Sequence, residues 1–97
     1  MSVNINISSE NNNCSFYANF LSRNKIKSKI YPSIFIQNER IYDGCTISLE
    51  NKFNNQKILN SIIKNISKEI SISYLQIDGL IDGDLYYPYH SFIKLTK

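Results

Sequence analysis

Residues 26–49, IKSKIYPSIFIQNERIYDGCTISL, carry the pattern of two β-strands joined by a tight turn. Apolar and polar residues alternate on both sides of Asn38-Glu39, and a period of two is the spacing of a half-buried strand. The stretch therefore predicts a hairpin whose strands cover 26–36 and 40–49, with Asn38-Glu39 as its two-residue turn.

That turn fixes the register of the expected hairpin. Ile36 falls opposite Ile41, and the next pair brings Phe35 opposite Tyr42. Because apolar cross-strand pairs stabilise a sheet, both pairs support the interpretation. Within the second strand, Cys45, Ile47 and Leu49 share a face that we interpret as core.

Two positions interrupt the pattern. Pro32 has no N–H to donate to a ladder, so it predicts a strand edge, a bulge or a break. Asp43-Gly44 lies inside the second strand and predicts a bulge there.

The rest of the chain supplies further elements around the hairpin. Alternation predicts a strand over 3–8, and broad apolar arcs at helical spacing predict helices over 14–23 and 55–69. Asn54 or Asn55 is a suitable N-cap for the second helix. Strands are predicted over 70–77 and 85–95, the last one as an edge because it contains Pro88.

The resulting order is β-α-β-β-α-β followed by one more strand. The first six elements match the ferredoxin-like plan, in which two helices cover one face of an antiparallel sheet. We therefore expect residues 1–97 to form a small single-domain two-layer α+β sandwich, with an extra C-terminal edge strand.

The composition indicates the kind of genome that encodes the chain and its location in the cell, but it says little about the function. Asn (13), Ile (17) and Lys (9) dominate the chain, which is typical of an AT-rich gene, a virus or a mobile element. No apolar run approaches the ~20 residues of a membrane span, and the first residues do not resemble a secretory signal. We expect a cytoplasmic protein in which Cys14 and Cys45 are reduced thiols, with a single disulfide as the alternative.

Little in the sequence indicates catalysis. His90 is the only histidine, and a nucleophilic pair with Cys14 or Cys45 has no further support. Three aspartates in a Gly-rich turn lack the spacing of a calcium loop and are more typical of a solvated loop. We expect no enzyme activity, no cofactor and no metal site.

The tyrosines are more informative, because exposed tyrosine is enriched at protein interfaces. The sequence predicts a partner-binding site at the C-terminal aromatic edge, flanked by acidic residues: Tyr86, Tyr87, Tyr89 and His90 with Asp78, Asp82 and Asp84. The expected function is a small inhibitor, antitoxin or immunity-type protein, or an anti-defence accessory protein of a virus or mobile element. Its partner would be a toxin or a host-defence effector, and a homodimer remains open.

The alternative is a small nucleic-acid-binding protein. The net charge is +3, which supports phosphate binding only where basic residues cluster. They gather in one segment and along one face of the second expected helix: Arg23, Lys25, Lys27 and Lys29, then Lys57, Lys64 and Lys68.

Overall fold

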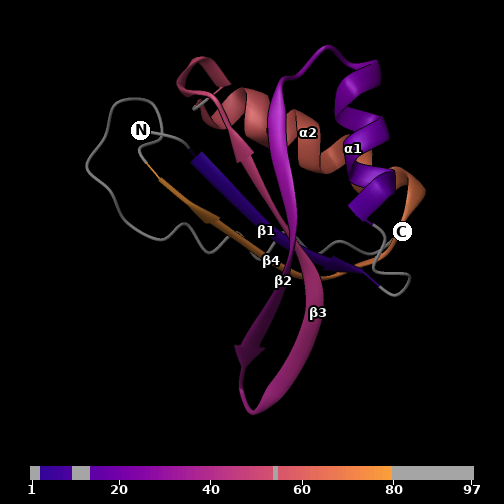
Figure 1. Cartoon of the computed structure of the whole chain (residues 1–97), viewed down its shortest axis with the longest axis vertical. Coiled ribbons are helices and arrows are strands. Elements are labelled where there is room, and N and C mark those ends of the chain that lie inside the picture. The colour runs from indigo at the N-terminus through magenta and orange to yellow at the C-terminus, as the bar shows by residue number, and fades with distance from the viewer. Residues whose placement is uncertain (1–2, 10–13, 54, 80–97) are drawn as a thin grey trace.

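The computed structural model describes residues 3–9, 14–53 and 55–79. Figure 1 shows their elements, which follow one another along the chain as β1 (Val3–Ser9), α1 (Cys14–Arg23), β2 (Ser28–Gln37), β3 (Arg40–Leu49), the short 3₁₀ helix η1 (Asn51–Phe53), α2 (Gln56–Glu69) and β4 (Ile72–Asp78). The described residues thus form an α+β structure. The strand predicted over 85–95 lies outside the described residues.

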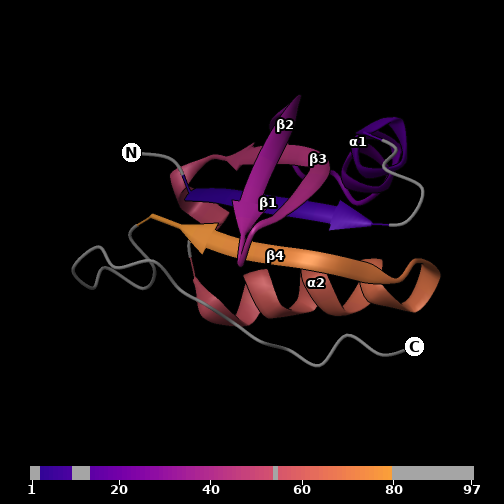
Figure 2. The ribbon, with the colours of Figure 1, turned by 90° about the horizontal axis from the view of Figure 1, so that it is seen from below.

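The sheet has four strands in the order β2-β3-β1-β4, and every pair is antiparallel. Its strands are strongly twisted, and α2 runs along β4 (Figure 2). One cluster of buried side chains joins the sheet to both helices. It includes Ile5 from β1, Ile47 from β3, Leu21 from α1 and Ile63 from α2. The core therefore lies between the helices and one face of the sheet.

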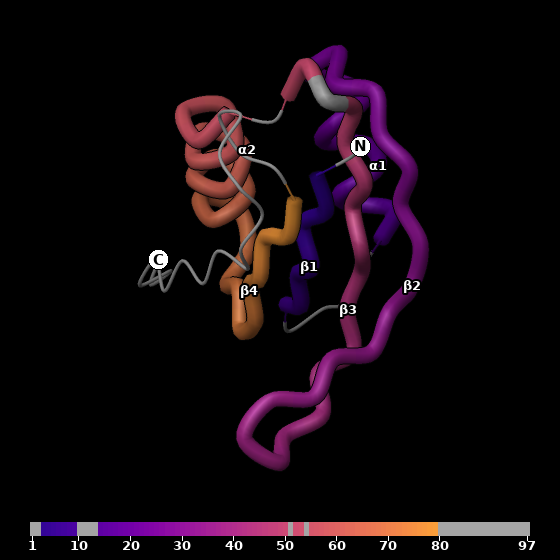
Figure 3. Tube along the Cα trace, turned by 90° about the vertical axis from the view of Figure 1, so that its left-hand side faces the viewer, coloured from indigo at the N-terminus to yellow at the C-terminus, as the bar shows by residue number. Residues whose placement is uncertain are grey.

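The predicted hairpin is confirmed. β2 pairs with β3 in the expected register, with Ile36 opposite Ile41. Asn38 and Glu39 have φ angles of 52° and 64°, which two-residue hairpin turns of type I′ require. Pairing of β1 with β3 ends at Cys45, so the hairpin runs on beyond the sheet, as Figure 3 shows.

The bulge predicted at Asp43-Gly44 is wrong. Ile34 pairs with Asp43 and Ser33 with Gly44 in unbroken register. Gly44 is needed for another reason: a Cβ there would overlap the carbonyl oxygen of Ile7 and come within 2.7 Å of the Phe35 ring. The irregularity in this sheet lies instead at the end of β1, where its pairing with β4 shifts register.

Capping explains where the elements begin and end. The Asn55 side chain accepts a hydrogen bond of 2.8 Å from the Ile58 backbone N–H, confirming Asn55 as the N-cap of α2. After α1, the Ile26 N–H donates to the Leu21 carbonyl at 2.9 Å, and the Lys25 N–H donates to Ser22 at 3.1 Å. These two hydrogen bonds form a Schellman motif. Because Ile26 is hydrogen-bonded to α1, β2 begins two residues later than expected.

Lys25 occupies the left-handed position of that motif, with a φ of 58°. Lys25→Gly is expected to raise the free energy of unfolding by about 0.5–1 kcal/mol, because glycine removes the Cβ clash of this conformation. Urea denaturation measures the change. Lys27→Gly is the control, since Lys27 has no positive φ, and should be neutral or destabilising. An unchanged or lower stability for Lys25→Gly would contradict this account.

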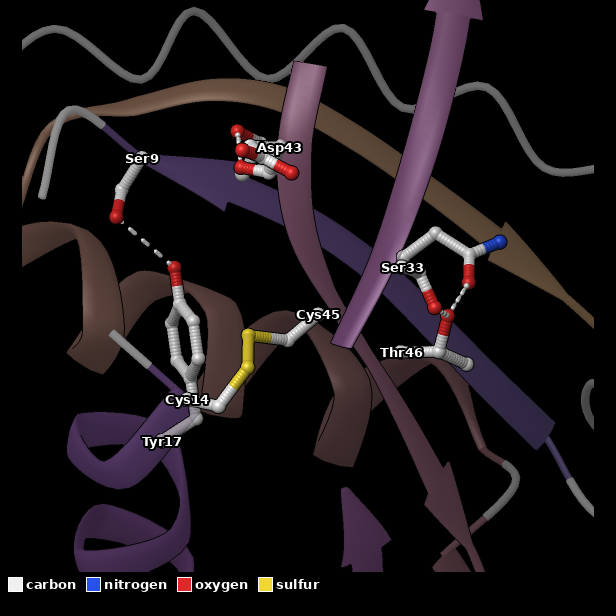
Figure 4. Close-up of a disulfide and its surroundings, with 9 residues drawn as sticks. Ser9, Cys14, Tyr17, Ser33, Asp43, Cys45 and Thr46 are labelled. Atoms are coloured by element: carbon white, nitrogen blue, oxygen red, sulfur yellow. Dashed lines mark hydrogen bonds between the residues drawn. A yellow bond between two sulfur atoms is a disulfide. The ribbon is translucent and has the colours of Figure 1, made fainter. Parts of the chain in front are cut away.

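The expectation that the two cysteines are free thiols is wrong. They form a disulfide, with 5.9 Å between their Cα atoms, that ties the first residue of α1 to the middle of β3 (Figure 4). Cys45 lies on the core face of β3 and is fully buried. The packing of α1 on that face brings Cys14 within bonding reach, a contact that spacing in the sequence does not reveal.

Tyr17 is the largest fully buried side chain of the core. Its hydroxyl donates a hydrogen bond of 3.2 Å to Ser9 at the end of β1, as Figure 4 shows. Burial raises the pKa of Tyr17 above 10.0, while the hydrogen bond to Ser9 lowers it by less. The folded protein thus favours the neutral phenol.

Because the folded pKa is the higher one, Tyr17 contributes stability that is fully present below pH 10.0 and is lost as the pH rises through the folded pKa. Tyr17→Phe should weaken this alkaline decline. At neutral pH it should cost about 1 kcal/mol, because Ser9 loses its partner. Urea denaturation across the alkaline range tests both effects, and an identical pH slope in the two proteins would contradict the first.

Candidate functional site

Three isoleucines near the end of the β2–β3 hairpin are exposed to solvent. The exposed fraction is 67% for Ile34 and 73% for both Ile36 and Ile41. Ile36 and Ile41 face each other across the hairpin, and Ile34 is two residues away along the same strand face. We call these three residues the isoleucine patch.

The register explains why the patch exists. Along β2, Ile30 and Pro32 lie opposite Ile47 and Cys45, which face the core. Ile34 and Ile36 continue the same row of side chains, because side chains alternate along a strand. The hairpin, however, extends past the end of the sheet and away from both helices (Figure 1). The patch therefore continues the row of core residues along the strands, but no described helix or strand packs over it.

The other face of the hairpin is packed. Phe35 of β2 stacks on Tyr74 of β4, with ring centroids 4.8 Å apart and an interplanar angle of 9°. Tyr42 lies 5.3 Å from Tyr74, and the Arg40 guanidinium is 5.8 Å from the Tyr42 ring. Burial, and then the charge of Asp78, raise the pKa of Tyr74. This aromatic cluster holds the hairpin against the sheet, so the two faces differ sharply.

A polar network continues from the cluster across the same face of the sheet. The Thr46 hydroxyl donates a hydrogen bond of 2.9 Å to the side-chain oxygen of Asn6. It also lies 2.7 Å from the Ser33 hydroxyl, a contact drawn in Figure 4. Asn6 in turn donates to the Asp78 carboxylate at 3.2 Å. Asp78, predicted to border a partner site, is thus engaged within the sheet.

The structure separates the predicted basic residues. The Arg23 guanidinium lies 3.9 Å from the carboxylate of Glu69 at the end of α2, and the Lys27 ammonium lies 3.8 Å from the Glu50 carboxylate. Both pairs are exposed, so each contributes little to stability, but each offsets one positive charge. Lys29 lies opposite Ser48 in the β2–β3 ladder, and its side chain belongs to the sheet face that the helices do not cover.

The lysines of α2 form a separate stripe. Lys57, Lys64 and Lys68 are exposed, as expected, while Leu59 and Ile66 on the other side of the helix are buried. Lys29 belongs to the opposite side of the sheet from this stripe, whereas Arg23 lies beside Glu69 at the end of α2. The predicted basic residues of the described part of the chain are therefore divided between two sides of the molecule.

The predicted partner site falls mostly beyond Gly79, the last residue that the structure describes. Tyr86, Tyr87, Tyr89, His90, Asp82 and Asp84 lie outside the described residues. Over the ranges that the structure does describe, no three His, Cys, Asp or Glu side chains come close enough to hold a metal ion. Neither α-helix among those ranges is long and apolar enough to cross a membrane.

Comparisons with protein-family models, with curated proteins and with solved structures find no match for this chain. The surface chemistry of the described residues is therefore the basis for any assignment of function. Sequence reasoning missed the isoleucine patch, since period-two apolar residues are taken as buried. A signal was present: Ile34, Ile36 and Ile41 lie within four residues of the Asn38-Glu39 turn, and turns lie at the protein surface.

Proposed function

We propose that this chain is a non-enzymatic protein-binding module that acts by forming a complex. It would be an inhibitor, immunity-type protein or antitoxin, or an anti-defence accessory protein of a virus or mobile element, and its partner a toxin or host-defence effector. The observation that carries the proposal is the isoleucine patch, with exposed fractions of 67–73%. Contiguous exposed apolar side chains are characteristic of interaction sites.

The energetics agree with this role. Burying an isoleucine side chain fully is worth about 1.5–3 kcal/mol, so three together could dominate a small interface. The aromatic cluster behind the patch keeps the hairpin in place, which limits the entropy lost on binding. A positioned apolar surface of this kind suits recognition better than catalysis.

The disulfide bears on where the complex would form. Such bonds persist in oxidising compartments and are rare in the cytoplasm. The cytoplasmic location suggested by the sequence rested partly on reduced Cys14 and Cys45, and their pairing removes that support. We therefore favour an oxidising compartment.

The test is affinity capture of a partner, followed by measurement of its affinity for variants of this chain. Ile36→Thr with Ile41→Thr should weaken binding by about 2 kcal/mol or more, about 30-fold, because both side chains would leave the interface. Threonine keeps the β-branched shape that strands favour, so the thermal midpoint should stay unchanged. Calorimetric titration with the purified partner gives the affinities.

The matched control is Lys64→Glu with Lys68→Glu, which changes an exposed surface away from the hairpin. It should leave partner affinity unchanged. If the isoleucine variant binds as tightly as the parent chain, the patch is not the interface. Tyr86→Ala and Tyr89→Ala then test the C-terminal site that the sequence predicts.

Nucleic-acid binding remains the second candidate, supported by the exposed stripe of Lys57, Lys64 and Lys68. Nuclease treatment separates the two proposals, because a protein complex survives it. Phosphate-driven binding should also fall about 10³-fold or more between 50 and 200 mM salt if six phosphates are contacted. The ion pairs of Arg23 and Lys27 argue against so many contacts.

For the fold, we propose the ferredoxin-like plan. The order of elements and the strand order β2-β3-β1-β4 support it, as do two helices that share one core with the sheet. The additional edge strand over 85–95 stays a prediction.

A further inference from the structure

We propose that the edge of β2 that points away from β3 binds an extended segment of another protein as an added strand, and that this segment is apolar at its N-terminal end and acidic at its C-terminal end. This inference rests on the proposed protein-binding function and specifies the chemistry of the partner. Among the described strands, β2 is the edge strand next to β3. Added strands gain affinity from main-chain hydrogen bonds and specificity from alternate side chains.

The backbone of β2 offers those hydrogen bonds. In a two-residue hairpin the pair beside the turn, here Gln37 and Arg40, exchanges both of its hydrogen bonds, and bonded pairs then alternate along the strands. Ile36, Ile34 and Ile30 fall at the other positions, so their N–H and C=O groups point away from β3. Pro32 falls there too, which is where a proline costs no ladder hydrogen bond.

A groove runs beside this edge. It lies between α1 and the start of β2, and its lining consists of Ala18, Ser22, Ile26, Lys27, Ser28 and Ile30. The two helical residues are small, and the strand side is partly apolar. On the same strand face, Ile30 and Pro32 lead to the isoleucine patch. An added strand could thus place apolar side chains along one continuous row.

Charge places the acidic end of the segment beside the start of β2. Lys29 projects from the other face of β2, and Lys25 lies just before the strand. Within the described part of the chain, neither has a carboxylate within 4.0 Å. An antiparallel segment would meet Ile36 and Ile34 first and Lys29 and Lys27 last. Its apolar residues therefore come first and its acidic residues follow.

A second copy of this chain fits the edge less well. In an antiparallel pair of two β2 strands, outward-pointing residues lie opposite outward-pointing residues, so near-full-length pairing would set each Lys29 opposite Phe35 or Gln37 of the second copy. The lysines would gain no carboxylate, so their charge would stay uncompensated in such a dimer. We therefore assign the edge to a different protein.

The experiment uses the full chain, isotopically labelled, and a capped ten-residue peptide as the probe. The peptide has Val at its first, third and seventh positions, Glu at its eighth and tenth, and Ser or Thr elsewhere. Antiparallel pairing sets its first residue opposite Ile36 and its eighth opposite Lys29. The control peptide carries Lys in place of both Glu residues.

The glutamate peptide should slow hydrogen exchange of the Ile30, Ile34 and Ile36 amides by at least about tenfold, and the lysine peptide should not. Ile34→Pro should abolish the effect, because it removes an outward N–H without breaking a ladder bond. Ile34→Thr should retain it in weaker form. No protection, equal protection by both peptides, or protection that grows with protein concentration in the absence of peptide would overturn the proposal.

The peptide experiment and the capture experiment test different claims, so either one can fail without the other. If a captured partner depends on Ile36 and Ile41 but the peptide leaves β2 unprotected, protein binding stands and strand addition is wrong. If the peptide protects β2 but mutation of Ile36 and Ile41 does not affect a captured partner, strand addition stands and the role of the isoleucine patch is wrong.

Discussion

Reduction of the Cys14–Cys45 disulfide is expected to lower the free energy of unfolding by about 3.5 kcal/mol. The bond closes a loop with a sequence separation of 31 residues, and cross-linking a loop of that length restricts the unfolded chain substantially. Small domains are stable by only about 5–15 kcal/mol, so the reduced protein would be marginal. Urea denaturation with and without a reducing agent measures the difference.

The double variant Cys14→Ala with Cys45→Ala is the control. It should unfold at nearly the same urea concentration as the reduced parent chain, and the reducing agent should not affect it. The account is wrong if thiol titration of the oxidised, denatured chain finds two free thiols, or if reduction leaves the urea midpoint unchanged.

Gly44→Ala is expected to destabilise the fold by about 3 kcal/mol, the upper end for forcing an extra group into a packed region. The added Cβ would overlap the Ile7 carbonyl oxygen and approach the Phe35 ring within 2.7 Å. Neither the central strand β1 nor a ring stacked on Tyr74 can move away cheaply. Urea denaturation and the near-ultraviolet signal of the tyrosines would both report the change.

A second variant separates the two obstacles. Phe35→Leu with Gly44→Ala removes the ring contact but leaves the backbone contact with Ile7. If the backbone is the main obstacle, adding Phe35→Leu restores little stability. A Gly44→Ala protein as stable as the parent chain would show that β1 and β3 do not approach as closely as described.

Local patterns predicted the elements well. The Asn38-Glu39 turn fixed the register of the hairpin, and Asn55, one of the two N-cap candidates, caps α2. The boundaries moved by up to two residues where a helix end retained the next residue. Ile26 and Ile70, for example, each donate a backbone hydrogen bond to the helix that precedes them.

Contacts between distant elements could not be predicted in the same way. The disulfide depends on how α1 packs on β3, and the need for glycine at position 44 depends on how closely β1 and the Phe35 ring approach. The isoleucine patch depends on where the sheet ends, because Ile34 and Ile36 follow the same alternation as buried Ile47. The period of the apolar residues shows which side chains share a strand face, but it does not show whether another part of the protein covers that face.

These features together divide the molecule by role. The disulfide and the core hold both helices on the sheet, and the aromatic cluster fixes the base of the hairpin. The hairpin then presents Ile36 and Ile41 to solvent at 73% exposure each. Binding through the hairpin would thus need little rearrangement of the described fold.

Site-specific photo-cross-linking tests the central claim most directly. A benzophenone amino acid is placed at position 41 in one protein and at position 64 in another, and each is irradiated with the captured partner. Protein binding through the isoleucine patch predicts a cross-linked complex from position 41 and none from position 64. Cross-links from position 64 alone would contradict the account and locate the interface on α2.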